Sequence, residues 1–147
     1  MAHERESGEP DPEHRRPEGV SDETVEALGV ISEALERTHR ARGHLYAWHQ
    51  LTGGADAALD RAVELLRRGG HHEIADRIDR DLIGLNVIDG RWTFQVVEEY
   101  DALYYSTFQA IEAEAREGLA GGRTHIYEAE LKQKRRSPGL PGHETAP

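Results

Sequence analysis

The chain has 147 residues, a formal net charge of -10 from 28 acidic residues against 18 Lys and Arg, and no cysteine. Such a charge repels nucleic acid and anionic membranes, so we expect neither as a partner. The lack of cysteine excludes disulfides, thiolate metal sites and a cysteine nucleophile. No segment has the apolar length of a signal peptide or a membrane span, so we expect a cytoplasmic protein. The excess of arginine over lysine is typical of a GC-rich bacterial coding sequence.

Both ends of the chain have the composition of disordered segments. Residues 1–20 are rich in proline and charge and offer almost nothing to bury, which predicts a disordered arm in which His3 and His14 have no role. Residues 137–147 are rich in proline and glycine and predict a loose tail. The helical domain is therefore expected between these ends, over residues 21–122.

The first long helix of that domain is predicted over residues 22–52. Asp22 lies where the positive end of the helix dipole favours negative charge, and Gly53-Gly54 provides a stop signal. The buried stripe of this helix is expected on alternating steps of three and four residues. Its members are Leu28, Ile31, Leu35, Thr38, Arg42, Leu45 and His49.

Two short helices and a turn are predicted next. Residues 55–70 begin near a possible cap, Asp56, and residues 71–84 follow as a second amphipathic segment. Asp89-Gly90 then gives a strong hairpin signal, although strands this short are marginal alone. We therefore expect a turn with at most a residual two-stranded ribbon.

The second long helix is predicted over residues 93–122, and residues 123–136 predict a short helix that docks on the domain. An apolar stripe along the long helix is interrupted once, at Asp101. The cost of leaving a carboxylate without a partner in a core is several kcal/mol, so Asp101 needs one. The apolar members of the stripe are Phe94, Val97, Tyr104, Phe108, Ile111 and Ala115.

An antiparallel pairing of the two long helices brings their polar positions together. Leu28 then faces Ala115, and Ile31 and Leu35 face Ile111 and Phe108. Arg42 faces Asp101 at the centre. The resulting polar layer, a candidate ligand site, comprises Arg42, Asp101, His39, Tyr46, His49, Tyr104 and Tyr105. Two interpretations stay open: an ion pair that fixes the register, or a pocket for a small ligand or metal.

Acidic pairs three residues apart give a second candidate site. Glu33 and Glu36 lie on the first long helix, and Glu98 and Asp101 on the second; Glu73 with Asp76 is an alternative second pair. Carboxylates at this spacing on facing helices can hold Mg²⁺ against the phosphates of a nucleotide. This layout resembles the helical nucleotide pyrophosphatases of the MazG kind, and the resemblance implies a magnesium-dependent hydrolase.

The sequence as a whole predicts an all-α protein, an antiparallel hairpin of two long helices bridged by two short ones. Val30, Ile83, Tyr100 and Leu103 are apolar residues left outside the stripes, so we expect a homodimeric helical bundle. The predicted function is a binding or assembly module with an unknown protein partner and no cofactor. The alternative is the magnesium-dependent nucleotide pyrophosphatase.

Overall fold

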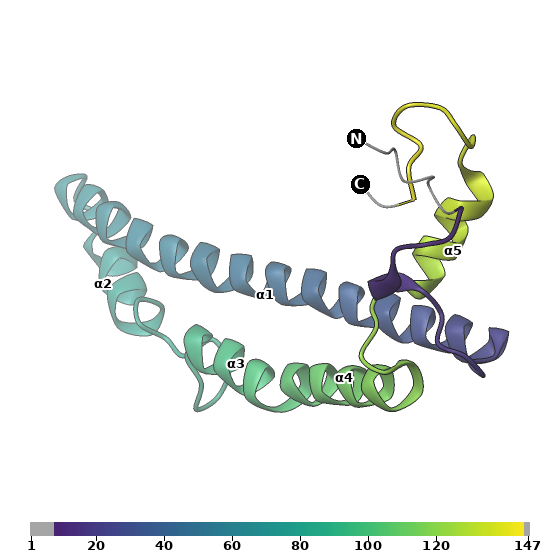
Figure 1. The fold of residues 1–147 in the computed structure, drawn as a ribbon. Helices are drawn as coiled ribbons and strands as arrows, with labels where there is room; N and C mark the ends of the chain where they lie inside the picture. The colour runs from purple at the N-terminus through teal and green to yellow at the C-terminus, as the bar shows by residue number, and fades with distance from the viewer. Residues whose placement is uncertain (1–7, 146–147) are drawn as a thin grey trace. The chain divides into compact units, whose positions relative to one another are not determined.

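The computed structural model describes residues 8–145, and within them the protein is all-α (Figure 1). No described helix is both long enough and apolar enough to cross a membrane. The chain forms two compact units, residues 1–37 with 107–147 and residues 38–106. In chain order the elements are η1 (Pro12–His14), α1 (Asp22–Arg68), α2 (His72–Asp81), α3 (Thr93–Tyr100), η2 (Asp101–Tyr105), α4 (Ser106–Ala120) and α5 (Ile126–Arg135).

Helix α1 does not stop at Gly53-Gly54, so the prediction of a separate helix over 55–70 is wrong. The three-and-four spacing of the covered stripe continues past the glycines without a change of phase. Its further members are Thr52, Asp56, Leu59, Val63 and Leu66, all of them at least partly buried. Each glycine within the helix costs about 1 kcal/mol relative to alanine. Covering the stripe on both sides of the glycines offsets that cost, because tertiary packing supplies most helix stability.

Helix α2 is held beside the end of α1 by two ion pairs and by the buried methyl group of Ala75. Arg67 of α1 lies 3.2 Å from Asp76 and 2.8 Å from Asp79 of α2, and Ala75 is fully buried. α2 is therefore the one short helix between α1 and the following loop, where the sequence predicts two.

The loop after α2 contains the predicted turn at Asp89-Gly90. Ile88 and Arg91 form an isolated antiparallel bridge, in which the Arg91 N–H donates to the Ile88 carbonyl at 2.9 Å. Gly90 has a φ of 69°, a left-handed value that glycine adopts without strain. The described residues contain no strand beyond this bridge. The two-stranded ribbon that the sequence allows is thus reduced to a single bridge.

The predicted second long helix is interrupted by η2, a π-helical segment. A π turn contains an additional residue, so the residues that follow are shifted around the helix by about one position. The prediction that Tyr104 and Ile111 lie in the buried stripe is accordingly wrong: they are 56% and 58% exposed. Tyr105 and Glu112 are the partly buried residues instead. Phe94, at the start of α3, is 39% exposed, whereas Val97 is buried as predicted.

In the unit of residues 1–37 and 107–147, α5 docks on α1. Val25, Ala120 and Ile126 form a buried cluster there. Gly29 permits the close approach, because a Cβ at this position would lie 3.3 Å from the Cβ of Tyr127. The segment 123–136, predicted as a short docking helix, thus contains α5.

Residues 8–20 make contacts that their composition does not predict. The Arg16 guanidinium bonds both carboxylate oxygens of Glu130, at 2.8 and 2.9 Å, and Asp22 at 2.6 Å. The His14 ring donates from Nδ1 to the Thr124 carbonyl at 2.7 Å. These bonds hold His14 and Arg16 on α5 and the loop before it, and the disordered arm expected over residues 1–20 includes residues 1–7, which the structure does not describe. His3 lies outside the described residues.

Residues after α5 are also in contact with one another. The Ser137 N–H donates to His143 Nδ1 at 3.1 Å, and Arg136 donates to the His143 carbonyl at the same distance. Both bonds involve the segment 137–147, which the sequence predicts as a loose tail. Its last two residues, 146–147, lie outside the described part of the chain.

The continuity of α1 predicts the sign of one substitution. Gly54 is exposed within the helix and nothing lies within 4 Å of a Cβ added there. Gly54→Ala should therefore raise the free energy of unfolding by about 0.5–1 kcal/mol, measured by urea denaturation. Gly43→Ala, also within α1 and unobstructed, should give the same gain. Gly70→Ala should destabilise, because the φ of Gly70 is 81°. A loss of stability from Gly54→Ala would contradict the continuous helix.

Candidate functional site

Arg42 of α1 and Asp101 of η2 form a bidentate ion pair, as the sequence predicts. Arg42 Nε lies 2.7 Å from Asp101 Oδ1, and Nη2 lies 2.8 Å from Oδ2. The expectation that the pair is buried is wrong, because the two side chains remain 34% and 33% exposed. Hydrogen bonding from Arg42 holds the pKa of the Asp101 carboxyl below its usual range. Water screens the pair, so its contribution to stability is expected to be small.

Aromatic rings enclose the Arg42 guanidinium. Its carbon lies 5.7 Å from the centre of the Tyr46 ring and 5.6 Å from that of Tyr105, within the range of cation–π attraction. The Tyr105 hydroxyl is 2.5 Å from His39 Nδ1, which extends the layer along α1. Asp101 and Tyr105 are four residues apart and both lie on the covered side, whereas Tyr104 in the same π-helical segment is exposed.

The remaining predicted members of the polar layer lie at its margins. His49 Nδ1 is 2.7 Å from the Thr93 hydroxyl, and the His49 ring packs edge-on against Tyr46 with centroids 5.8 Å apart. Tyr104 points to the exposed side of η2, where its ring contacts Tyr100 at 5.7 Å. The layer is thus a set of mutually paired groups. This geometry favours the interpretation of an ion pair that fixes the register over that of a ligand pocket.

Two of the four predicted magnesium ligands pair with arginines. Glu33 pairs with Arg37 one turn along α1, and both oxygens of Asp101 bond Arg42. Across residues 8–145, no three His, Asp or Glu side chains lie close enough together to hold a metal ion. A magnesium site formed by Glu33, Glu36, Glu98 and Asp101 stays a prediction.

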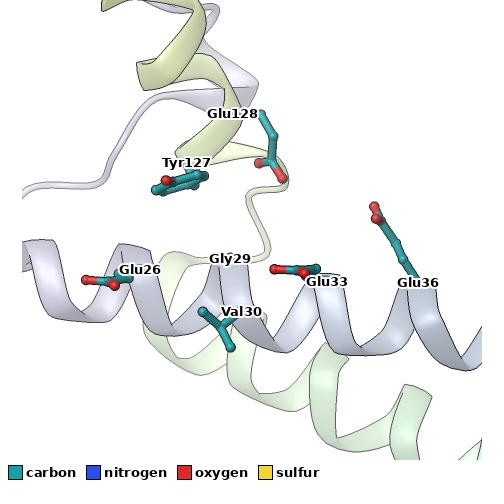
Figure 2. A pocket seen from close by; sticks show the side chains of 7 residues that line it. All are labelled: Glu26, Gly29, Val30, Glu33, Glu36, Tyr127 and Glu128. Atoms are coloured by element: carbon teal, nitrogen blue, oxygen red, sulfur yellow. The ribbon is translucent and has the colours of Figure 1, made fainter.

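A carboxylate-lined pocket lies between α1 and α5, with a cavity of about 240 Å³. Figure 2 shows the Tyr127 ring above Gly29, with the carboxylates of Glu26 and Glu33 to either side. The full lining is Glu26, Gly29, Val30, Glu33, Glu36, Tyr127 and Glu128. Its four glutamates make the pocket attractive to cations and repulsive to phosphates. The spacing of Glu26, Glu33 and Glu36 was visible in the sequence, but the docking of α5 was needed to form the cavity.

A second pocket, the Trp92 pocket, lies in the unit of residues 38–106 and has a volume of about 270 Å³. It is lined by Thr52, Gly53 and Asp56 of α1, the loop residues Gly84, Leu85, Val87 and Trp92, and Thr93 of α3. Asp56 Oδ1 accepts the Gly84 N–H at 2.9 Å and so ties the loop to α1. Sequence reasoning missed this pocket because it assigned Gly53 to a helix stop and Asp56 to a helix cap.

Comparison of the chain with protein-family models, with curated proteins and with solved structures finds no match. Function must therefore be inferred from the geometry of the described residues. The polar layer is internally paired and the carboxylate pocket is strongly acidic. The Trp92 pocket combines apolar walls with one carboxylate.

A double-mutant cycle tests the Arg42–Asp101 pair. Asp101→Asn should lower the free energy of unfolding because Arg42 loses its charged partner, and Arg42→Met should lower it as well. The double mutant should lose less than the sum of the two single losses, since the interaction can be removed only once. Urea denaturation of the four proteins measures the coupling. Strictly additive losses would mean that the pair contributes nothing to stability.

The same pair predicts a direction of pH dependence. Because the folded-state pKa of Asp101 is lowered, its contribution to stability is complete above the ordinary aspartate pKa and is lost as pH falls through the lowered value. The difference in unfolding free energy between wild type and Asp101→Asn should shrink as pH falls below about 4. Carboxyl NMR gives an independent measurement: Arg42→Met should move the Asp101 pKa upward. An Asp101 pKa that is unchanged by Arg42→Met would contradict the pairing.

Proposed function

We propose that this protein is a binding and assembly module, an antiparallel helical hairpin that forms a homodimer through the apolar surface around Trp92. The observation that carries the proposal is a group of large apolar side chains that are left exposed in the lining of the Trp92 pocket and next to it in the chain. We call this group the Trp92 surface. Its members, with their exposed fractions, are Leu85 (65%), Val87 (38%), Ile88 (53%), Trp92 (60%) and Phe94 (39%).

The size of the Trp92 surface supports assembly. A half-exposed side chain of this size offers about 100 Å², so the five residues present roughly 500 Å² of apolar area. That value lies near the upper end of the largest apolar patch on an ordinary monomer, and such patches commonly mark interaction sites. The domain is also small, so association is an efficient way to bury further apolar surface.

The hairpin part of the proposal is supported within residues 38–106 by three side-chain contacts. Arg42 pairs with Asp101, His39 with Tyr105, and His49 with Thr93. The partner's residue number falls as the α1 number rises, as antiparallel segments require.

The alternative is a magnesium-dependent nucleotide pyrophosphatase. Two of its predicted magnesium ligands, Glu33 and Glu36, line a pocket that also contains Glu26 and Glu128. Four carboxylates repel a polyphosphate, so a cation would have to bind among them first. Assembly through apolar surface requires no bound cation.

The proposed dimer should depend on protein concentration and on salt. Sedimentation velocity over roughly 1 to 100 µM should detect a monomer–dimer equilibrium with a micromolar dissociation constant. Association should strengthen as NaCl rises from about 0.05 to 0.5 M, because salt screens the repulsion between two copies that each carry a net charge of -10. A monomer at every concentration and salt level would contradict the proposed homodimer. Weakening by salt would indicate ion-pair assembly instead.

A further inference from the structure

The geometry points to a two-fold dimer in which Trp92 of each copy inserts into the Trp92 pocket of the other. This inference rests on the proposed function. It specifies the binding partner, which is a second copy of the chain, and the residues through which the two copies touch. Three features carry it: a glycine in the pocket lining, a hydrogen-bond acceptor for an indole, and an exposed tryptophan that is itself part of the lining.

The pocket is open at Gly53. No atom lies within 4 Å of the position where a Cβ on Gly53 would stand, and the residue is exposed on α1. Leu85 and Val87 supply apolar walls and are themselves 65% and 38% exposed. An entering flat apolar side chain therefore meets no side chain at Gly53 and can contact the apolar walls.

Asp56 gives the pocket a specific polar group. Its Oδ1 accepts the Gly84 N–H, and an ionised carboxylate has a second oxygen able to accept another hydrogen bond. Tryptophan has an apolar body and a single N–H donor, which usually finds an acceptor when the ring is buried. An apolar wall with one acceptor thus matches an indole better than it matches an aliphatic side chain.

Contacts within its own chain position Trp92 so that it can serve as an anchor. Its side chain is 60% exposed, although its ring packs edge-on against Phe94 with centroids 5.5 Å apart and planes at 81°. Its backbone N–H donates to Gln95 Oε1 at 2.9 Å, which fixes the residue at the start of α3. A pre-positioned aromatic anchor loses little conformational freedom on binding, and tryptophan is enriched among residues that dominate binding energy.

An anchor and a pocket on the same surface favour a second copy as the occupant. In a two-fold contact the same patch meets itself, so each Trp92 can enter the partner's pocket and both anchors are buried. The area agrees with this arrangement. A standard interface covers about 800 Å² on each partner and its core is about 65% apolar, close to the roughly 500 Å² that the Trp92 surface presents.

Gly53→Leu tests the pocket, with Gly54→Leu as a matched control. Both glycines are exposed within α1 and have open space at the Cβ, but only Gly53 lines the pocket. Leucine is a better helix former than glycine, so both variants should remain folded, as circular dichroism can verify. Gly53→Leu should raise the dimer dissociation constant by at least about tenfold, whereas Gly54→Leu should leave it unchanged.

Trp92 itself provides a direct readout. In a Trp48→Phe background Trp92 is the only tryptophan of the chain, so its fluorescence reports its own surroundings. The emission should shift to shorter wavelength as protein concentration rises, because insertion removes the indole from water. Addition of Gly53→Leu should abolish the shift, and Trp92→Ala should raise the dissociation constant by at least about tenfold.

The outcomes separate this inference from the proposed function. A dimer that is unaffected by Gly53→Leu and by Trp92→Ala would overturn the Trp92 contact and leave the assembly module intact. Absence of any dimer would overturn both. Equal weakening by Gly53→Leu and Gly54→Leu would also overturn the inference, because the effect would then come from the helix and not from the pocket.

Discussion

The covered stripe of α1 is the constraint on which the other helices depend. It keeps its spacing of three and four residues from Leu28 to Leu66, and within each unit other segments must cover it. Its polar positions determine where those segments lie. Arg42 requires the carboxylate of Asp101, His49 bonds the Thr93 hydroxyl, and Asp56 accepts a backbone N–H of the loop. Specific hydrogen bonds thus set the register, while the apolar positions supply less directional attraction.

Prediction from the sequence succeeded where a single helical periodicity determines which residues are covered. The spacing of Arg42 and Asp101 in their stripes predicted their contact, and the all-α class followed from the same periodicity. Local sequence signals gave wrong predictions where they conflicted with the periodicity of the covered stripe. Gly53-Gly54 has the composition of a helix stop, but the covered positions keep the same three-and-four spacing before and after it. The helix therefore continues through the two glycines. The π segment escaped prediction because an additional residue in a turn leaves no compositional mark, and it displaced Tyr104 and Ile111 from their expected side.

The candidate site was predictable to a similar extent. The polar layer could be assembled from the sequence because its members lie on two long periodic segments. The Trp92 pocket could not, since it combines the middle of α1 with a loop whose path depends on the bond between Asp56 and Gly84. The carboxylate pocket likewise required the docking of Tyr127 over Gly29, a contact between residues far apart in the chain. Sites formed by irregular segments depend on tertiary contacts that periodicity does not encode.

The π-helical segment η2 also affects how this chain can tolerate changes in length. An insertion in a regular helix rotates every later side chain by about 100° unless the additional residue is accommodated locally. In η2 the additional residue is accommodated within five positions, beside the Arg42–Asp101 pair that fixes the preceding turn. Leu103, 74% exposed in this segment, is a position from which one residue could be removed to restore a regular helix. A chain one residue shorter here would keep Tyr105 and Glu112 on the covered side, because the step from Asp101 to Tyr105 would then fit a regular helix.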